Sequence, residues 1–256
     1  MQKTVLTSGG VRLVVREAGP VDAPAVVLVH GWAQSGEAWG EVPGFRTFAL
    51  DLRGHGESEV PPGGYRDSAV WAADLAAVLA HVGRPATVVG WSYGGLVVAD
   101  YLRVHGTRLV EGLVLVGAIT EIGRGRAGGA VGPVMREALP GALTDDVALA
   151  RFCARMAPSL PASTVERLTA AALRVPHRVR AELFARDVGS GEVLSAVDVP
   201  AIVVHGSDDE VVSPSAADHA ATMIPGAELM VIPDTGHLPF LERPAVFLEA
   251  LAKVAR

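Results

Sequence analysis

Short runs of apolar and β-branched residues alternate along most of this chain with stretches that carry the apolar spacing of an α-helix. The runs predicted to be strands are residues 3–8, 11–17, 25–29, 47–50, 87–90, 113–117, 201–205 and 229–232. The helical stretches that alternate with them are residues 65–82, 94–105, 214–224 and 244–254. This alternation favours right-handed βαβ units. It predicts an α/β fold in which an eight-stranded, mostly parallel sheet carries helices on both faces.

One long stretch, residues 121–196, breaks the alternation because it contains no convincing strand. Its helical patterns are residues 144–156, 163–175 and 177–187. Thr144 and Ser163 begin two of these patterns and are the expected N-caps. We expect a core of residues 1–120 and 197–256, with residues 121–196 inserted between strands six and seven as a helical cap. Pockets form at the carboxyl ends of parallel strands, so the cap is expected to line the substrate site rather than merely elaborate the scaffold.

Composition and charge exclude several classes of protein. A chain of 256 residues suits one domain, and half of its residues are hydrophobic. The net charge of −6 argues against nucleic acid and anionic membranes as partners, since both attract basic patches. No apolar run approaches the roughly 20 residues of a membrane helix, and residues 1–10 lack the apolar segment of a signal peptide. With Cys153 as its one cysteine, the protein is expected to be cytoplasmic, and its oligomeric state stays open.

The pentapeptide Gly90-Trp91-Ser92-Tyr93-Gly94 has the pattern G-x-S-x-G. A buried strand is predicted before it and a helix after it, which is the context of a nucleophile elbow. Glycines on both sides would let strand and helix pack closely around a serine held in a strained turn. The alternative is a glycine-rich turn whose serine only caps the helix. We favour Ser92 as a nucleophile.

A serine nucleophile needs a histidine base, and His237 is the best placed of the eight histidines. It follows the last predicted strand, so it would lie at the same edge of the sheet as Ser92. His30 and His205 also end strands, but each precedes a glycine and is expected to be a turn residue. The remaining histidines lie in helical stretches or loops.

The imidazole in turn needs an acid that holds its tautomer. Asp209 follows the seventh strand and is favoured over its neighbour Asp208, with Glu121 beyond the sixth strand as a further candidate. The chain order Ser92, Asp209, His237 is the order of the nucleophile-elbow enzymes. No pair of histidines occurs at i, i+4 on a predicted helix and no Cys/His cluster exists, so we expect neither a metal nor another cofactor.

Attack on a carbonyl creates an oxyanion that fixed N–H groups must receive. The backbone N–H of Tyr93, directly after the nucleophile, is the first expected donor. The second is the backbone N–H of Trp32, because Gly31 allows the chain to turn after the third strand. The Trp32 side chain is expected to form a pocket wall, and Trp39 is expected to pack in the core.

Five segments give the chain a resemblance to the α/β-hydrolase superfamily over nearly its whole length. They are His30-Gly31-Trp32, residues 51–58 (DLRGHGES), residues 90–95, residues 206–209 and Gly236-His237. Residues 101–120 look like the cofactor-free haloperoxidase/aryl-esterase branch. Trp32 and Trp39, together with residues 90–92, look like pimeloyl-carrier-protein methyl esterase. The resemblance implies an α/β-hydrolase fold.

The resemblance also implies roles for single residues. In such relatives the loop of residues 51–58 is structural, so Arg53 and His55 are expected to tie it to the sheet rather than contact substrate. Some peroxide-using relatives have proline where this chain has Ala33, which argues against perhydrolase activity. Epoxide hydrolases and haloalkane dehalogenases need a carboxylate at the position of Ser92. Cys153 is expected to be a small buried hydrophobe.

We therefore expect a serine hydrolase that cleaves a small to medium, fairly apolar carboxylic ester through an acyl-serine intermediate. Trp32, Trp91 and Tyr93 would flank the site. Two other enzymatic reactions fit the same triad, namely hydrolysis of a carbon–carbon bond in a diketone-like substrate and acyl transfer or perhydrolysis. A non-catalytic ligand receptor on this fold is the alternative from another class.

Overall fold

A single sheet of eight strands organises residues 2–255, the part of the chain that the computed structural model describes. The strands are β1 (Gln2–Ser8), β2 (Val11–Ala18), β3 (Ala25–Val29), β4 (Arg46–Asp51), β5 (Ala86–Trp91), β6 (Val110–Val116), β7 (Ala201–Gly206) and β8 (Glu228–Ile232). Their order in the sheet is β1-β2-β4-β3-β5-β6-β7-β8. Strand β2 runs antiparallel to both of its neighbours, and all later pairs are parallel. The predicted eight-stranded, mostly parallel α/β fold is confirmed.

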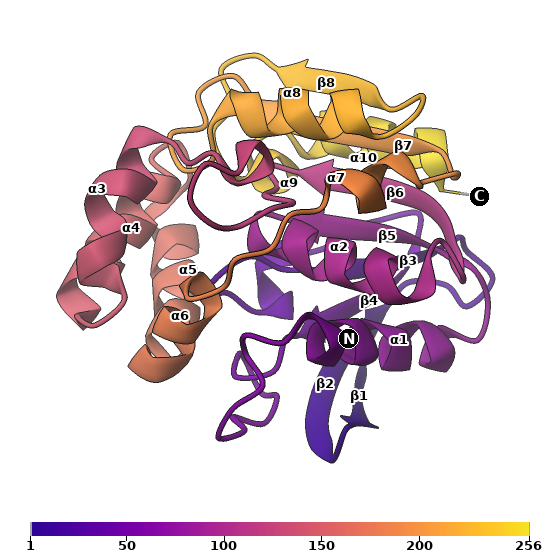
Figure 1. The fold of residues 1–256 in the computed structure, drawn as a ribbon, viewed down its shortest axis with the longest axis horizontal. Helices are drawn as coiled ribbons and strands as arrows, with labels where there is room; N and C mark the ends of the chain where they lie inside the picture. Colours follow the sequence, from indigo (N-terminus) through magenta and orange to yellow (C-terminus); the bar gives the residue numbers. More distant parts are fainter. Residues whose placement is uncertain (1, 256) are drawn as a thin grey trace.

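Helices cover both faces of this sheet. One layer, in front of the sheet in Figure 1, consists of α1 (Ser68–Val82), α2 (Tyr93–His105), α7 (Gly191–Ser195) and α8 (Pro214–Met223). The other layer contains the 3₁₀ turn η1 (Gly36–Trp39), α9 (Pro239–Glu242) and α10 (Pro244–Val254). Strands β3 and β5 to β7 are buried along almost their whole length, as strands covered on both faces must be. Among residues 2–255, no helix combines the length and apolarity of a membrane span.

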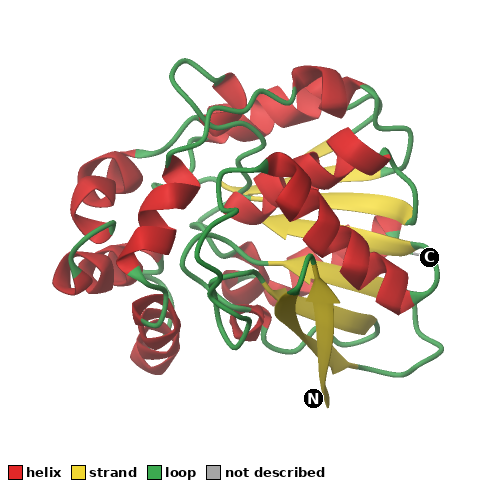
Figure 2. Ribbon diagram, turned by 60° about the horizontal axis from the view of Figure 1, so that its bottom comes forward, coloured by secondary structure: helices red, strands yellow, loops and turns green. Residues whose placement is uncertain are grey.

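The segment between β6 and β7 is mostly helical. It contains the short turn η2 (Ala127–Gly129) and the helices α3 (Pro133–Ala142), α4 (Asp146–Met156), α5 (Ala162–Leu173) and α6 (His177–Phe184) before α7. Figures 1 and 2 show α3 to α6 grouped beyond one end of the sheet. Helix α3 was not predicted from the sequence, because Pro140 and Gly141 conceal its apolar spacing.

Two expected helix caps were wrong. Helix α4 is capped by Asp145 rather than Thr144, since the Asp145 carboxylate accepts a hydrogen bond from the backbone N–H of Ala148 at 2.6 Å. Ser163 lies inside α5, which begins directly after Pro161. Proline there already fixes a backbone angle compatible with the start of a helix, and no side-chain cap forms.

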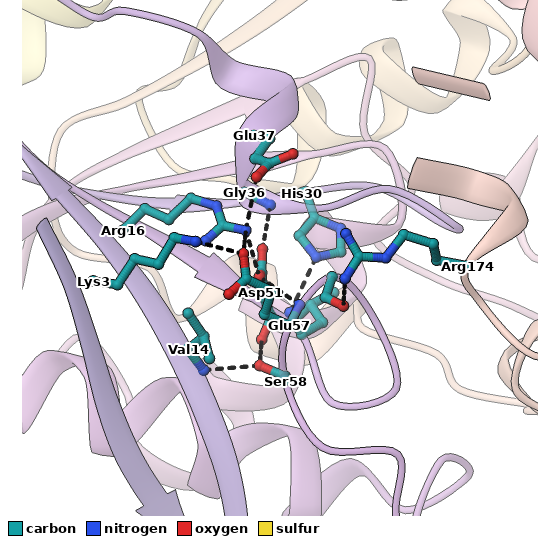
Figure 3. A network of polar contacts seen from close by, with 12 residues as sticks. Lys3, Val14, Arg16, His30, Gly36, Glu37, Asp51, Glu57, Ser58 and Arg174 are labelled. Atoms are coloured by element: carbon teal, nitrogen blue, oxygen red, sulfur yellow. Dashed lines mark hydrogen bonds and ion pairs between the residues drawn. The ribbon is translucent and has the colours of Figure 1, made fainter. Parts of the chain in front are cut away.

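A buried carboxylate, Asp51, ties the loop of residues 51–58 to the sheet (Figure 3). Its Oδ1 accepts a hydrogen bond from the N–H of Gly36 at 2.7 Å, and its Oδ2 accepts one from the N–H of Glu57 at 2.9 Å. Arg16 of β2 approaches the same Oδ2 to 3.1 Å. These contacts also hold the segment that follows β3, because Gly36 lies at its end.

Arg53 and His55 make buried structural contacts within this loop. The guanidinium of Arg53 forms two hydrogen bonds of 2.6 Å with the buried carboxylate of Asp74 on α1. His55 Nδ1 lies 2.9 Å from the carbonyl oxygen of Arg53. The contacts agree with the structural roles that the family resemblance implied.

His30 and His55 form a buried pair with ring centroids 5.2 Å apart. His30 Nε2 accepts a hydrogen bond from the N–H of Leu52 at 3.0 Å, which requires that nitrogen to be unprotonated. Burial lowers the pKa of His30 to about 4 and that of His55 to about 3. Both rings are therefore neutral in the folded protein at neutral pH.

This pair predicts a loss of stability in mild acid. Below about pH 6.5 the unfolded chain binds protons that the folded protein does not, so each histidine lowers the unfolding free energy by about 1.4 kcal/mol per pH unit until its folded pKa is reached. The double variant His30→Gln/His55→Asn keeps an acceptor and a donor near these positions but cannot titrate. Urea unfolding between about pH 7 and pH 5 should show a shallower pH dependence for the variant than for the wild type. Equal slopes would contradict the assignment.

Candidate active site

Ser92 occupies a strained turn between β5 and α2. Its backbone has φ 54° and ψ −122°, a conformation that L-residues rarely adopt. The turn is tight because a Cβ on Gly94 would lie 2.2 Å from the carbonyl oxygen of Val29, and a Cβ on Gly90 would lie 2.9 Å from the Gly95 nitrogen. The two glycines of the motif are thus required by close packing between backbones. The arrangement of strand, turn and helix is that of a nucleophile elbow.

His237, in the loop after β8, is held by Asp209, in the loop after β7. The distance between His237 Nδ1 and Asp209 Oδ2 is 2.8 Å, and both side chains are buried. With Nδ1 engaged in this way, Nε2 is the ring nitrogen left to exchange a proton with another group. His237 and Ser92 both line the same small cavity.

The carboxylate of Asp209 is stabilised in its charged form. Its Oδ1 accepts hydrogen bonds from the N–H groups of Val211 at 2.8 Å and Val212 at 3.0 Å. Burial opposes ionisation, but the interactions of the carboxylate with His237 and His205 and its hydrogen bond from the Val212 N–H together outweigh burial, and the pKa of Asp209 lies below its ordinary value. An ionised Asp209 would stabilise the imidazole of His237 when that ring becomes positively charged.

The other two candidate acids lie elsewhere. Asp208 is exposed, and its carboxylate accepts a hydrogen bond from the Ser207 hydroxyl at 2.8 Å. Glu121 accepts hydrogen bonds from the N–H groups of Gly128 at 3.0 Å and Ser190 at 2.8 Å. Glu121 thus joins the beginning and the end of the helical segment, and of the three carboxylates Asp209 is the one that contacts His237.

His205 is a neighbour of the site that sequence reasoning missed. It was expected to be a turn residue, but it lies within β7, and its Nε2 is 3.5 Å from Asp209 Oδ2 and 3.2 Å from the carbonyl oxygen of Val212. Burial lowers its pKa, so a neutral ring packs beside the carboxylate.

The cavity at Ser92 is small and mostly apolar. Its volume is about 10 Å³, and it is lined by Gly31, Trp32, Trp91, Ser92, Met135, Phe152, Met156, Val211 and His237. Met135 belongs to α3, and Phe152 and Met156 belong to α4. Residues from the segment between β6 and β7 therefore form one wall of the cavity.

The aromatic residues near the site take different roles. Trp32 lines the cavity, whereas Trp39 packs against Phe240 with ring centroids 4.4 Å apart, so both follow expectation. Tyr93 was expected to flank the site, but it is not among the residues that line this cavity. Its hydroxyl donates a hydrogen bond to the carbonyl oxygen of Leu183 at 3.1 Å, because the turn at Ser92 directs Tyr93 into the first position of α2 and toward α6.

The backbone of Ala33 and the environment of Cys153 bear on two expectations from the sequence. Ala33 has φ 54°, a backbone conformation that the ring of a proline could not adopt at this position. Cys153 is buried in α4, and burial raises the pKa of its thiol to about 11. It is the small buried residue that was expected. Within residues 2–255, no group of three His, Cys, Asp or Glu side chains is arranged to hold a metal ion.

Comparison with known proteins identifies the family of this chain. Residues 26–250 match the alpha/beta hydrolase family, and the chain belongs to that family. It is 27% identical over 250 residues to a pimeloyl-[acyl-carrier protein] methyl ester esterase of Vibrio vulnificus, covering 91% of this chain and 94% of that protein. It is 30% identical over 257 residues to a non-heme haloperoxidase of Rhodococcus erythropolis, covering 91% and 92%.

Solved structures give the same result. An esterase from Rhodococcus sp. ECU1013 is 43% identical, with a TM-score of 0.94 over 99% of this chain and 98% of that one. An aryl esterase from Burkholderia cenocepacia, described as putative, is 27% identical, with a TM-score of 0.83 over 98% and 97%. The protein is therefore an enzyme of the α/β-hydrolase class, with relatives in the two branches that the sequence resembled.

The contact between Asp209 and His237 predicts the effect of removing one charge. Asp209→Asn should keep the packing but disturb the tautomer and charge of the imidazole, a change that costs about 10⁴-fold in kcat in a serine protease. The initial rate of p-nitrophenyl butyrate hydrolysis measures the effect. Asp208→Asn, one residue away and exposed, is the matched control and should keep wild-type activity. Equal rates for both variants would contradict the assignment of Asp209.

Proposed function

We propose that this protein is a serine esterase that cleaves a small to medium carboxylic ester through an acyl-serine intermediate, with Ser92, His237 and Asp209 as its catalytic triad. One observation carries the proposal. Ser92, strained at the end of β5, shares a cavity with His237, whose Nδ1 is held by buried Asp209. A serine beside an oriented imidazole is the arrangement that activates a hydroxyl for attack on a carbonyl.

In the first half of the reaction, Ser92 Oγ attacks the ester carbonyl while His237 Nε2 takes the hydroxyl proton. The carbonyl oxygen becomes an oxyanion that accepts hydrogen bonds from the backbone N–H groups of Trp32 and Tyr93. Tyr93 is the first residue of α2, where backbone N–H groups have no partner within the helix. His237 then gives the proton to the departing alcohol, and the acyl group remains on Ser92.

In the second half, water replaces the alcohol. His237 removes a proton from the water as it attacks the acyl-serine, and the same oxyanion position receives the charge. The intermediate collapses, the proton passes to Ser92 Oγ, and the carboxylic acid leaves. Asp209 stabilises the positively charged imidazole in both halves. This chemistry uses only groups of the chain and water.

The walls of the cavity support an apolar substrate. Trp32, Trp91 and Phe152 offer aromatic surface, and two methionines contribute flexible side chains. A cavity of about 10 Å³ holds no more than one water molecule, so an ester fits only when these side chains move. We therefore propose that residues 121–196 act as a cap whose helices α3 and α4 adjust to the substrate. The names of the relatives, which include esterases, support ester hydrolysis.

The test compares Ser92→Ala with wild-type protein on p-nitrophenyl acetate and butyrate. Loss of the serine in a protease of this mechanism lowers kcat about a million-fold, so the variant should have no measurable activity. Ser195→Ala is the matched control, because that exposed hydroxyl binds only a carbonyl of its own helix, Glu192 O, at 2.9 Å. A fluorophosphonate probe should label the wild type and Ser195→Ala but not Ser92→Ala. Hydrolysis by Ser92→Ala at the wild-type rate would refute the proposal.

A further inference from the structure

Trp32 and Tyr93, the two proposed oxyanion donors, are both tied by their side chains to the same helix, α6. The indole Nε1–H of Trp32 donates a hydrogen bond to the carbonyl oxygen of Arg180 at 3.2 Å. The hydroxyl of Tyr93 donates one to the carbonyl oxygen of Leu183 at 3.1 Å. Trp32 follows β3 and Tyr93 follows β5, so one helix from the segment between β6 and β7 connects two separate loops of the core.

Phe184, the last residue of α6, reinforces this connection by packing. Its ring meets the ring of Trp32 edge-on at a centroid distance of 5.4 Å and the ring of Tyr93 at 6.2 Å. Trp32 and Tyr93 are themselves 4% and 1% exposed, so little solvent competes for these contacts. Leu183 lies in the last turn of α6, where carbonyl groups lack partners within the helix, and the Tyr93 hydroxyl satisfies one of them.

Two buried arginines fix α6. Arg180 donates hydrogen bonds to the carbonyl oxygens of Val175 at 2.8 Å and Ala142 at 3.3 Å, and to the carboxylate of Asp146 at 2.7 Å. Directly after α6, Arg186 donates to Asp100 of α2 at 2.6 Å and to the Tyr93 hydroxyl at 3.0 Å. The first set holds α6 to α3 and α4, and the second holds its end to the core.

We infer that α6 positions the oxyanion hole: through the side chains of Trp32 and Tyr93 it sets where their own backbone N–H groups point. The inference rests on the proposed function. An oxyanion is stabilised only when its donors lie within hydrogen-bond distance of the place it will occupy, and a misplacement of about 1 Å can cost about 100-fold in rate. Tyr93 and Arg186 are thus positioning residues, and a displacement of α6 acts on both donors at once.

Tyr93→Phe tests the inference by deleting one hydroxyl while the backbone N–H stays. Because the donor shifts rather than disappears, kcat for p-nitrophenyl butyrate should fall about tenfold, with KM within about twofold of the wild type. The inhibition constant of a trifluoromethyl ketone analogue, whose adduct with Ser92 places an oxyanion at the same position, should rise by the same factor as kcat falls. Phe184→Leu, which removes the shared ring, should act in the same direction.

Tyr101→Phe is the matched control. Tyr101 lies on the same helix as Tyr93 and its hydroxyl also binds a backbone carbonyl, that of Arg108, but about two turns further along α2, near the end opposite Ser92. The Tyr101→Phe variant should have a changed thermal stability but the kcat and the inhibition constant of the wild type. Equal losses of kcat in Tyr93→Phe and Tyr101→Phe would mean that the loss comes from lowered stability of the protein, and this result would overturn the inference.

Three further outcomes are decisive. A rise in KM at unchanged kcat would make α6 a wall of the binding site only, and the inference would fail. Wild-type kcat and inhibition constant in both Tyr93→Phe and Phe184→Leu, with Ser92→Ala inactive, would overturn the inference and leave the proposed function intact. An active Ser92→Ala would remove the proposed function itself, and the inference with it.

Discussion

The approach of the Gly94 backbone to the end of β3 is the constraint on which the rest of the site depends. A methyl group at Gly94 would come within 2.2 Å of the Val29 carbonyl oxygen, so α2 can begin where it does only without a side chain there. This contact places the strained Ser92 turn directly beside Gly31, whose own Cβ would lie 2.9 Å from that of Ser92. Ser92, the proposed nucleophile, and the loop carrying Trp32 are neighbours because these backbones touch.

Buried polar contacts then hold the surrounding loops in register with that turn. Asp51 binds the N–H of Gly36 and so secures the far end of the loop after β3, while α6 holds Trp32 in the middle of it. In the loop after β7, both carboxylate oxygens of Asp209 form hydrogen bonds within the protein. One accepts from a backbone N–H of its own loop, and the other contacts His237. Each carboxylate oxygen of Asp51 and Asp209 thus has a hydrogen-bond partner within the protein, as low-dielectric surroundings demand.

Elements with a clear period were predictable, and those without one were not. The buried strands and the long helices around the sheet follow their apolar spacing, and their observed bounds differ from expectation by a few residues. Helix α3 was not predicted because Pro140 and Gly141 interrupt its apolar spacing. Helix α9 was not predicted because four residues are too few to show a helical period. The caps were misassigned by one or two positions, since Thr144 stands beside the better acceptor Asp145 and Pro161 starts α5 without a side-chain cap.

The sequence by itself determined the alternation of strands and helices, the G-x-S-x-G turn and the chain order of Ser92, Asp209 and His237, because each depends on neighbours along the chain. Only the tertiary structure decided which of three carboxylates reaches His237, that His205 packs beside it, and that Tyr93 turns away from the cavity toward α6. Those outcomes depend on the distances between loops that follow different strands. Such distances arise from the packing of the whole sheet and its helices, and no local pattern of residues encodes them.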